Sequence, residues 1–177
     1  MACLILSLAC ERKDSSTSSA TSSQPSDQPP SPIQVTEATP SQTAIPYEET
    51  TLEILGKDAL NPQGHFSQIT DINSEDGNLA FTSTGTDPYF LLPALPKMPR
   101  GAKISIELTL PSKQMVQFFF QEIGKPEFSE KKSLIVVKDA GRQTIEWKLN
   151  TPLNGNFRLD PGTSVGDYII HKIRFVY

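Results

Sequence analysis

The sequence contains very little cysteine and histidine, which excludes several classes of protein. Its two cysteines, Cys3 and Cys10, both lie near the N-terminus, so the rest of the chain can form neither a disulfide nor a thiolate metal site. The two histidines, His65 and His171, are far apart in the sequence and belong to no Cys/His metal spacing. A disulfide-stabilised scaffold and a zinc module are therefore excluded.

Clusters of basic residues and long apolar runs are also lacking. The formal net charge is -4, and Lys131 and Lys132 are no more than a pair, whereas binding of nucleic-acid phosphates needs clustered Lys and Arg. No apolar run approaches the ~20 residues that a membrane-spanning helix needs. We therefore expect no nucleic-acid partner and no transmembrane helix.

Motifs of catalysis and of metal binding are missing too. The sequence has no Gly-x-Ser-x-Gly elbow, no phosphate-binding glycine loop, and no carboxylate pair that can be assigned to glycoside hydrolysis. Residues 71–78 follow part of a calcium-loop pattern, but their glycine comes one place late and no carboxylate occupies the twelfth position. A polar hairpin turn explains this segment better, so we expect no metal site and no cofactor. Because the catalytic motifs are missing, we also expect no enzyme activity and no catalytic residue.

Residues 1–10 form a short apolar run that ends in Ala9 and Cys10. This pattern resembles the end of a bacterial lipoprotein signal peptide, in which a small residue precedes a cysteine that carries a diacylglycerol. The run is shorter than the usual roughly 7–15 residues and no basic residue precedes it, so we expect the start codon to lie further upstream. The resemblance implies lipidation of Cys10; a buried N-terminal strand with two chance cysteines is the alternative.

Residues 11–48 are dominated by Ser, Thr, Pro and Gln and have few large apolar side chains. Such a segment cannot bury enough surface to offset the entropy of ordering it, so we expect a disordered linker. A spacer that lifts a domain off a membrane and an ordinary disordered tail would share this composition. Together with lipidation of Cys10, the linker predicts an extracytoplasmic protein, lipid-anchored to a bacterial membrane, with the outer membrane or the cell surface favoured.

Residues 49–177 alternate short β-branched and aromatic segments with Gly, Pro, Asn and Asp. In residues 103–110, apolar side chains occupy every second position, as in an antiparallel strand with one buried face. Residues 144–149 repeat this pattern and place Trp147 in the core. We expect strands near residues 51–55, 66–72, 78–84, 88–92, 103–110, 114–121, 133–138, 143–149, 156–159 and 168–176.

This pattern of many short strands predicts the fold class and leaves no segment for an amphipathic helix. Asp76-Gly77 and Asn154-Gly155 are dipeptides typical of turns between strands. The fold class is therefore all-β, a two-sheet antiparallel sandwich of the jelly-roll type over residues 49–177.

Several motifs of this domain come in a familiar order, at residues 77–81, 85–93, 118–120 and 157–162. They resemble the carbohydrate-binding-module-like, galactose-binding-like jelly rolls of bacterial surface proteins and of some membrane glycosyltransferases. The Arg-Leu-Asp-Pro-Gly stretch before the last strand is the most specific of these motifs. The resemblance implies a β-sandwich and makes sugar binding plausible, and it leaves a structural calcium open, but it transfers no defined set of contact residues.

Sugar sites combine an aromatic ring, which covers C–H groups, with a few planar polar side chains. We expect carbohydrate contacts from Gln117, Phe119 and Gln121, which share the face of a strand opposite to its core side, with Tyr89 at the rim. A solvated sheet face is the alternative for this set. The other ring candidates are Phe90, Trp147 and Tyr168.

Arg158 and Asp160 lie two positions apart and therefore share one face of a short strand. A structural polar pair, in which Asp160 anchors the Asp-Pro-Gly turn, is favoured over a pair that binds sugar hydroxyls. Three functions remain open: a glycan-binding module of the cell envelope, a structural or protein-interaction module of the envelope without a sugar site, and a small hydrolase. The sequence favours a non-catalytic module with a glycan or an envelope protein as partner, and the hydrolase least.

Overall fold

The computed structural model describes residues 48–177. The signal-peptide remnant with Cys10 and nearly all of the linker lie outside the described residues, so lipidation and linker disorder remain predictions. Within residues 48–177, no helix is long and apolar enough to cross a membrane.

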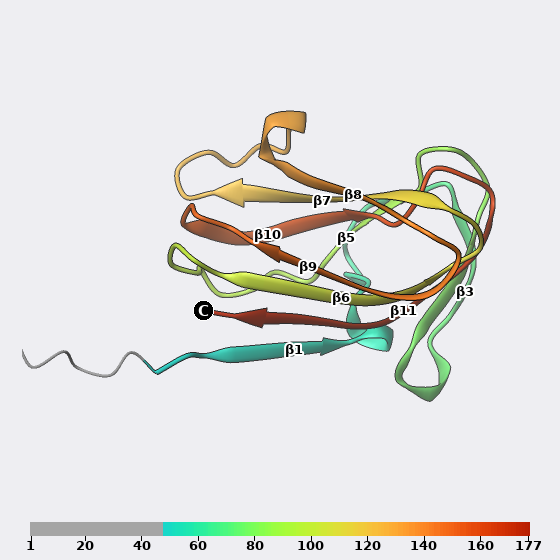
Figure 1. Cartoon of the computed structure of the whole chain (residues 1–177), viewed down its shortest axis with the longest axis horizontal. Helices are drawn as coiled ribbons and strands as arrows, with labels where there is room; N and C mark the ends of the chain where they lie inside the picture. Colours follow the sequence, from blue (N-terminus) through green and yellow to red (C-terminus); the bar gives the residue numbers. More distant parts are fainter. Residues whose placement is uncertain (1–47) are drawn as a thin grey trace, which may run out of the picture. The chain divides into compact units, whose positions relative to one another are not determined.

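The described residues form a sandwich of two antiparallel sheets, which confirms the predicted fold class (Figure 1). The six-stranded sheet has the order β3-β4-β11-β6-β9, and β1 also pairs with β11. Its strands are β1 (Thr51–Leu55), β3 (Ile69–Asn73), β4 (Leu79–Ser83), β6 (Lys103–Leu110), β9 (Gly141–Lys148) and β11 (Gly166–Val176). The five-stranded sheet has the order β2-β5-β10-β7-β8. Its strands are β2 (Phe66–Ser67), β5 (Tyr89–Leu91), β7 (Gln114–Glu122), β8 (Ser133–Lys138) and β10 (Leu153–Asp160).

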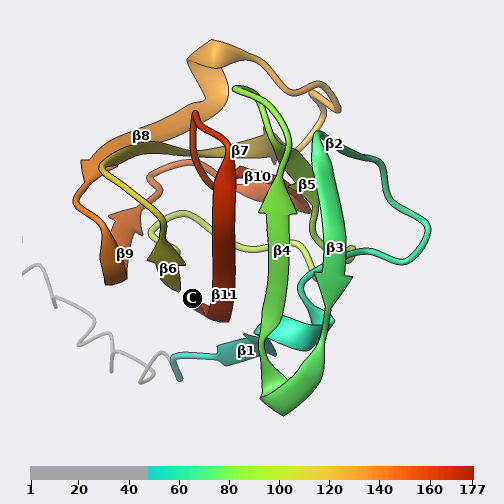
Figure 2. The ribbon, with the colours of Figure 1, turned by 90° about the vertical axis from the view of Figure 1, so that its right-hand side faces the viewer.

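Within residues 48–177, three short 3-10 turns connect strands at η1 (Gly56–Asp58), η2 (Glu75–Gly77) and η3 (Glu130–Lys132). Figure 2 shows β3 and β4 side by side next to the last strand, β11, as their pairing requires. The core lies between the two sheets. It is filled by the apolar side chains that alternation assigned to the inner faces of strands such as β6 and β7.

Trp147 is less buried than the alternation of its strand predicts. It stands opposite the fully buried Ile104 on the neighbouring strand, so it faces the core side of β9. Because β9 is an edge strand of its sheet, the indole is only half-buried and packs against the core from the side. The expectation of a buried Trp147 was therefore right in direction and wrong in degree.

One predicted strand is in fact two strands in different sheets. Residues 66–72 were expected to be continuous, but β2 pairs with β5 in the five-stranded sheet and β3 pairs with β4 in the six-stranded sheet. The chain changes sheet at Gln68, whose φ of 54° is left-handed and interrupts extended backbone. The Gln68 Oε1 accepts a hydrogen bond from the Asp87 backbone N–H at 2.8 Å, which fixes this crossing.

The two turn dipeptides have different outcomes. Asp76-Gly77 forms the turn between β3 and β4, with positive φ at both residues, as predicted. Asn154-Gly155 was predicted as a turn and instead lies inside β10, where the register with β7 shifts between Leu153 and Phe157. Gly155 has the positive φ expected of a turn residue, but here it serves a β-bulge.

Candidate functional site

The outer face of the five-stranded sheet carries the residues proposed from the sequence. On β7, Gln117, Phe119 and Gln121 alternate with Val116, Phe118 and Phe120, which belong to the core. The first set therefore points away from the core. Phe119 is buried but is not part of the core cluster, so another layer of side chains must cover it.

Arg158 provides that cover. It stands opposite Phe119 on the neighbouring strand β10, and its guanidinium carbon lies 4.8 Å from the centre of the Phe119 ring. The same carbon lies 4.0 Å from the centre of the Tyr89 ring on β5. Contacts of this kind between a cation and the face of a ring are favourable, the more so when water is partly excluded.

Asp160 fixes the orientation of Arg158. The Arg158 Nε and Nη2 donate to the two carboxylate oxygens of Asp160, each at 2.7 Å. Asp87 adds a second, more exposed carboxylate with Oδ1 at 3.6 Å from Nη2. Because the guanidinium is planar and is held by a two-point contact and by two rings, its position is set before any ligand arrives.

Burial of Asp160 changes its acidity. Burial raises the pKa of the Asp160 carboxyl to about 6, although the hydrogen bonds and the positive charge of Arg158 act in the opposite direction. At neutral pH the group is therefore still mainly ionised and remains the partner of Arg158. The pair is a positioned polar group, and nothing in its surroundings requires it to exchange protons with a substrate.

Gln117 and Gln121 hold the segment between β7 and β8 over this face. The Gln117 Nε2 donates to the Glu130 carboxylate at 2.7 Å and to the Ser133 Oγ at 2.9 Å. The Gln121 Nε2 donates to the Pro126 carbonyl at 3.1 Å, and its Oε1 accepts from Asn156 at 2.9 Å. Both ends of the Gln121 amide and the Nε2 of Gln117 thus have partners within the protein.

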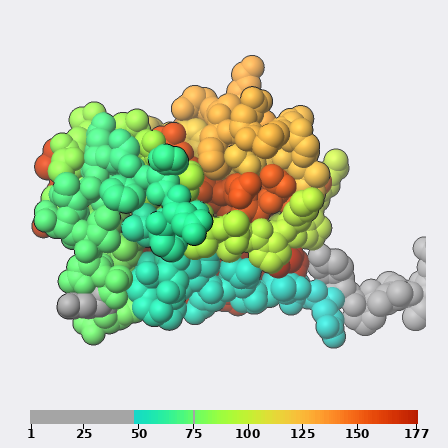
Figure 3. Space-filling view, turned by 180° about the vertical axis from the view of Figure 1, so that it is seen from behind, coloured from blue at the N-terminus to red at the C-terminus, as the bar shows by residue number. Residues whose placement is uncertain are grey.

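The consequence is a face that is only partly open. Exposure is 7% for Gln117, 4% for Phe119 and 8% for Gln121, so these side chains lie beneath the surface. Figure 3 shows the orange segment that follows β7 standing beside the red-orange surface of β10. Half-buried Tyr89 and Arg158, with exposed Asp87, form an accessible group that combines a ring with polar side chains.

The remaining ring candidates do not join this face. Phe90 and Tyr168 have no exposed surface, and the Tyr168 hydroxyl donates to the Ser164 carbonyl at 2.8 Å. Trp147 stacks on Phe118 with ring centres 5.9 Å apart, on the side of β9 that faces the other sheet. Tyr89 is therefore the ring candidate that combines exposure with a polar partner.

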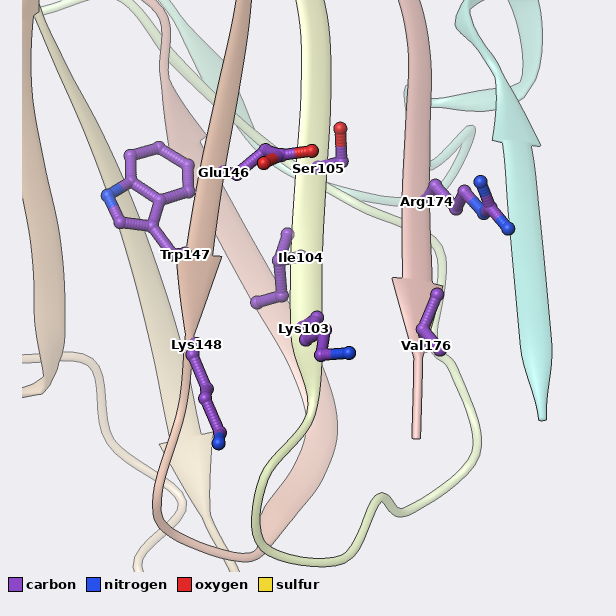
Figure 4. Close-up of a pocket in the computed structure, with 8 residues that line it drawn as sticks. All are labelled: Lys103, Ile104, Ser105, Glu146, Trp147, Lys148, Arg174 and Val176. Atoms are coloured by element: carbon purple, nitrogen blue, oxygen red, sulfur yellow. The ribbon is translucent and has the colours of Figure 1, made fainter. Parts of the chain in front are cut away.

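A second concave surface, which the sequence did not indicate, lies on the six-stranded sheet. It is a hollow of about 390 Å³ at the paired ends of β6, β9 and β11 (Figure 4). Its lining consists of Lys103, Ile104, Ser105, Glu146, Trp147, Lys148, Arg174 and Val176. A neighbouring hollow of about 220 Å³ shares Ser105 and Arg174 with it. The sequence could not reveal this set, because its members come from strands that are distant in the chain.

Metal-binding side chains do not gather in the part of the chain that the structure describes. Within residues 48–177, no group of three or more His, Cys, Asp or Glu side chains is placed to hold a metal ion. Residues 71–78, which resemble part of a calcium loop, form the end of β3 and the hairpin turn. His171 lies between the Asn78 Oδ1 and the Thr109 Oγ1, each at 2.8 Å, and burial lowers its pKa.

Comparison with known proteins gives neighbours in structure alone. No protein-family model and no curated protein matches the sequence. A low-affinity xylan-binding module, CBM86, from Roseburia intestinalis is similar at a TM-score of 0.48 and 8% identity, covering 71% of this chain and 94% of that one. A family 29 carbohydrate-binding module from Piromyces equi gives 0.49 and 14%, covering 72% and 90%.

A third neighbour is the C-terminal CBM6 of a laminarinase, LamC, from Zobellia galactanivorans, with a TM-score of 0.47 and 14% identity, covering 72% of this chain and 100% of that one. All three neighbours are carbohydrate-binding modules. Their identities and TM-scores are too low for the likeness to assign a ligand or a contact residue to this chain.

Proposed function

We propose that the sandwich is a non-catalytic glycan-binding module whose site is the outer face of the five-stranded sheet. The observation that carries this proposal is the stack of Tyr89 and Arg158, with the guanidinium carbon 4.0 Å from the ring centre and both side chains half-exposed. A half-exposed ring next to a fixed planar donor matches what sugar recognition needs, since a ring covers C–H groups and the donor binds hydroxyls.

The proposed site divides into contact residues and supporting residues. Tyr89, Arg158 and Asp87 would meet the sugar, because they are accessible and lie next to one another on the face. Gln117, Phe119 and Gln121 would support them from below, since Phe119 carries Arg158 and the two amides hold the covering segment. A small, open and polar site of this kind gives weak binding, with a Kd on the order of micromolar to millimolar.

Replacing Tyr89 by alanine tests the proposal. We expect Tyr89→Ala to weaken binding of a soluble polysaccharide about tenfold, because about 1.4 kcal/mol of ring contact is lost. Binding is measured by titration calorimetry against neutral glucans, xylan and mannan. The matched control is Phe66→Ala on the adjacent strand β2, an exposed ring that stands opposite Phe90 and so belongs to the other face of the sheet.

The control should bind like the unaltered chain. If a polysaccharide binds and the two variants bind it equally well, the Tyr89 face is not the site. If no polysaccharide of the panel and none from the source organism binds, the module has another partner.

An envelope protein is that second candidate, and one observation favours it. Ile135 and Val137 on the edge strand β8 are 53% and 57% exposed, and Met115 opposite Val137 is 38% exposed. An exposed apolar strip on an edge strand is a common site for contact between proteins. The apolar strip and the Tyr89 site lie on the same sheet but consist of different residues, so mutation of Ile135 or Val137 and mutation of Tyr89 distinguish the two candidates.

We propose further that the module is held outside the cytoplasm by a lipid on Cys10. The support is the Ala9-Cys10 pattern followed by a Ser-, Thr- and Pro-rich segment. Cys10→Ser is expected to move the protein, expressed in a bacterium, from the detergent phase to the aqueous phase in Triton X-114 partitioning. Cys3→Ser is the matched control and should remain in the detergent phase; equal partitioning of Cys10→Ser and the unaltered chain would refute the anchor.

A further inference from the structure

The hollow on the six-stranded sheet is lined by a row of polar side chains across three neighbouring strands. The strand register places Glu146 of β9 opposite Ser105 of β6, and Ser105 opposite Arg174 of β11. With neighbouring strands about 4.8 Å apart, the row is about 10 Å long. Figure 4 shows the Glu146 carboxylate directed toward Ser105, whereas the Arg174 side chain, at the far end of the row, extends from β11 toward β1.

The charges in this hollow are predominantly positive, although the chain as a whole has a net charge of -4. Lys103, Lys148 and Arg174 line the hollow, and Glu146 is the single carboxylate among its lining residues. Such a local excess of cations attracts anions to a surface that the rest of the protein would repel.

Arg174 has no carboxylate partner within residues 48–177. Arg174 is paired with Glu53 in the register of β11 with β1, but the Glu53 carboxylate lies 3.7 Å from the Lys172 ammonium instead. Lys103 makes a long contact of 3.8 Å with Glu49, in which both side chains are more than half exposed, so it is weakly held. The guanidinium is thus available for a bidentate contact with a carboxylate from outside the protein.

We infer that this hollow binds an acidic sugar unit, a uronate, of a polysaccharide. The uronate carboxylate would pair with Arg174, and its hydroxyls would donate to Glu146 and exchange hydrogen bonds with Ser105. Lys103 and Lys148 at the rim would add long-range attraction. This hollow and the Tyr89 face lie on different sheets. Uronate binding in the hollow therefore does not depend on the proposed function, and a mutation can abolish one binding activity without affecting the other.

The side chains that line the hollow favour an acidic sugar over an apolar ligand. Ile104 and Trp147 also line it, but Ile104 is buried and the indole leaves β9 on the side away from Glu146 to stack on Phe118 (Figure 4). The accessible lining therefore combines charged and hydroxyl groups with apolar surface such as that of Val176, a mixture that matches the polar groups and the C–H groups of a sugar. The adjoining hollow is also lined by polar and charged side chains, among them Thr144, Glu107 and Lys172. It gives room for the next sugar unit of the polysaccharide.

The test compares Arg174→Gln with Lys113→Gln in the full chain. Lys113 is an exposed cation at the far end of β6, so both variants lose one positive charge and only Arg174→Gln loses it in the hollow. The probes are polygalacturonate, neutral pullulan and dextran sulfate, and the Kd is measured at two salt concentrations. We expect polygalacturonate to bind, more weakly at higher salt, and Arg174→Gln to raise its Kd at least tenfold while Lys113→Gln changes it less than twofold.

Three results would overturn the inference. One is the absence of binding to polygalacturonate by the unaltered chain. Another is an equal loss in both variants, which would indicate attraction by overall charge. The third is stronger binding of dextran sulfate with the same dependence on Arg174, which would assign the hollow to sulfate esters. Thermal midpoints of the variants within about 2 °C of the unaltered chain show that the exposed substitutions leave the fold intact.

Discussion

Phe118→Ala is expected to lower the free energy of unfolding by about 3–5 kcal/mol. Phe118 has no exposed surface and its ring centre lies 5.3 Å from that of Phe157 and 5.9 Å from that of Trp147. Phe175 completes the cluster at 6.5 Å. Phe118 and Phe157 belong to the five-stranded sheet, whereas Trp147 and Phe175 belong to the six-stranded sheet, so the ring joins the two layers. Its removal leaves a cavity lined by rings of both sheets.

Urea unfolding followed by circular dichroism measures this loss of unfolding free energy, and tryptophan fluorescence provides a second measurement. Trp147 is the single tryptophan of the sequence and stacks on Phe118, so its emission should shift to the red in the folded variant. Phe66→Ala is the matched control, because it removes a ring that is 47% exposed, and it should cost less than about 0.5 kcal/mol. A loss below about 1 kcal/mol for Phe118→Ala would mean that the aromatic cluster does not hold the sheets together.

The strands could be predicted from the sequence wherever burial is one-sided. β6 and β9 alternate strictly because one face of each packs on the core and the other meets solvent, which gives the period of two that sequence reasoning detects. β7 was also recognisable, because Val116, Phe118 and Phe120 fill its core face. These local patterns carry the fold class.

Pairing between strands could not be predicted in the same way. The split at Gln68 depends on β2 and β3 finding partners in different sheets, and nothing in residues 66–72 records those partners. The half-burial of Trp147 likewise follows from the position of β9 at a sheet edge, which is a property of the whole arrangement.

The candidate site shows the same division between local pattern and long-range contact. Alternation places Gln117, Phe119 and Gln121 on the face of β7 away from the core. Their burial comes from Arg158 and from the segment after β7, whose positions depend on pairing and on hydrogen bonds made by Glu130. The hollow around Arg174 could not be predicted at all, because only the register of the strands brings residues 105, 146 and 174 together.

Gly155 lies in β10 three residues before Arg158, and Gly155→Ala is expected to lower the free energy of unfolding by about 4 kcal/mol or more. Gly155 has a φ of +88°, and a Cβ there would lie 2.0 Å from the Leu95 carbonyl oxygen. The Leu95 N–H donates to the Gly155 carbonyl at 2.9 Å, so the approach belongs to a hydrogen-bonded contact between residues 92–98 and β10. The backbone cannot yield without breaking that contact.

Gly124→Ala separates the two causes of this loss. Gly124 has a similar φ of +80°, but a Cβ there would meet no atom within 4 Å. Gly124→Ala should therefore show the conformational strain alone, about 1–2 kcal/mol, and the excess loss in Gly155→Ala measures the close approach of the two backbones. Urea unfolding of both variants gives this difference, and equal losses would show that residues 92–98 can move away from β10. In that case the close approach of the two backbones would not constrain β10 at Gly155.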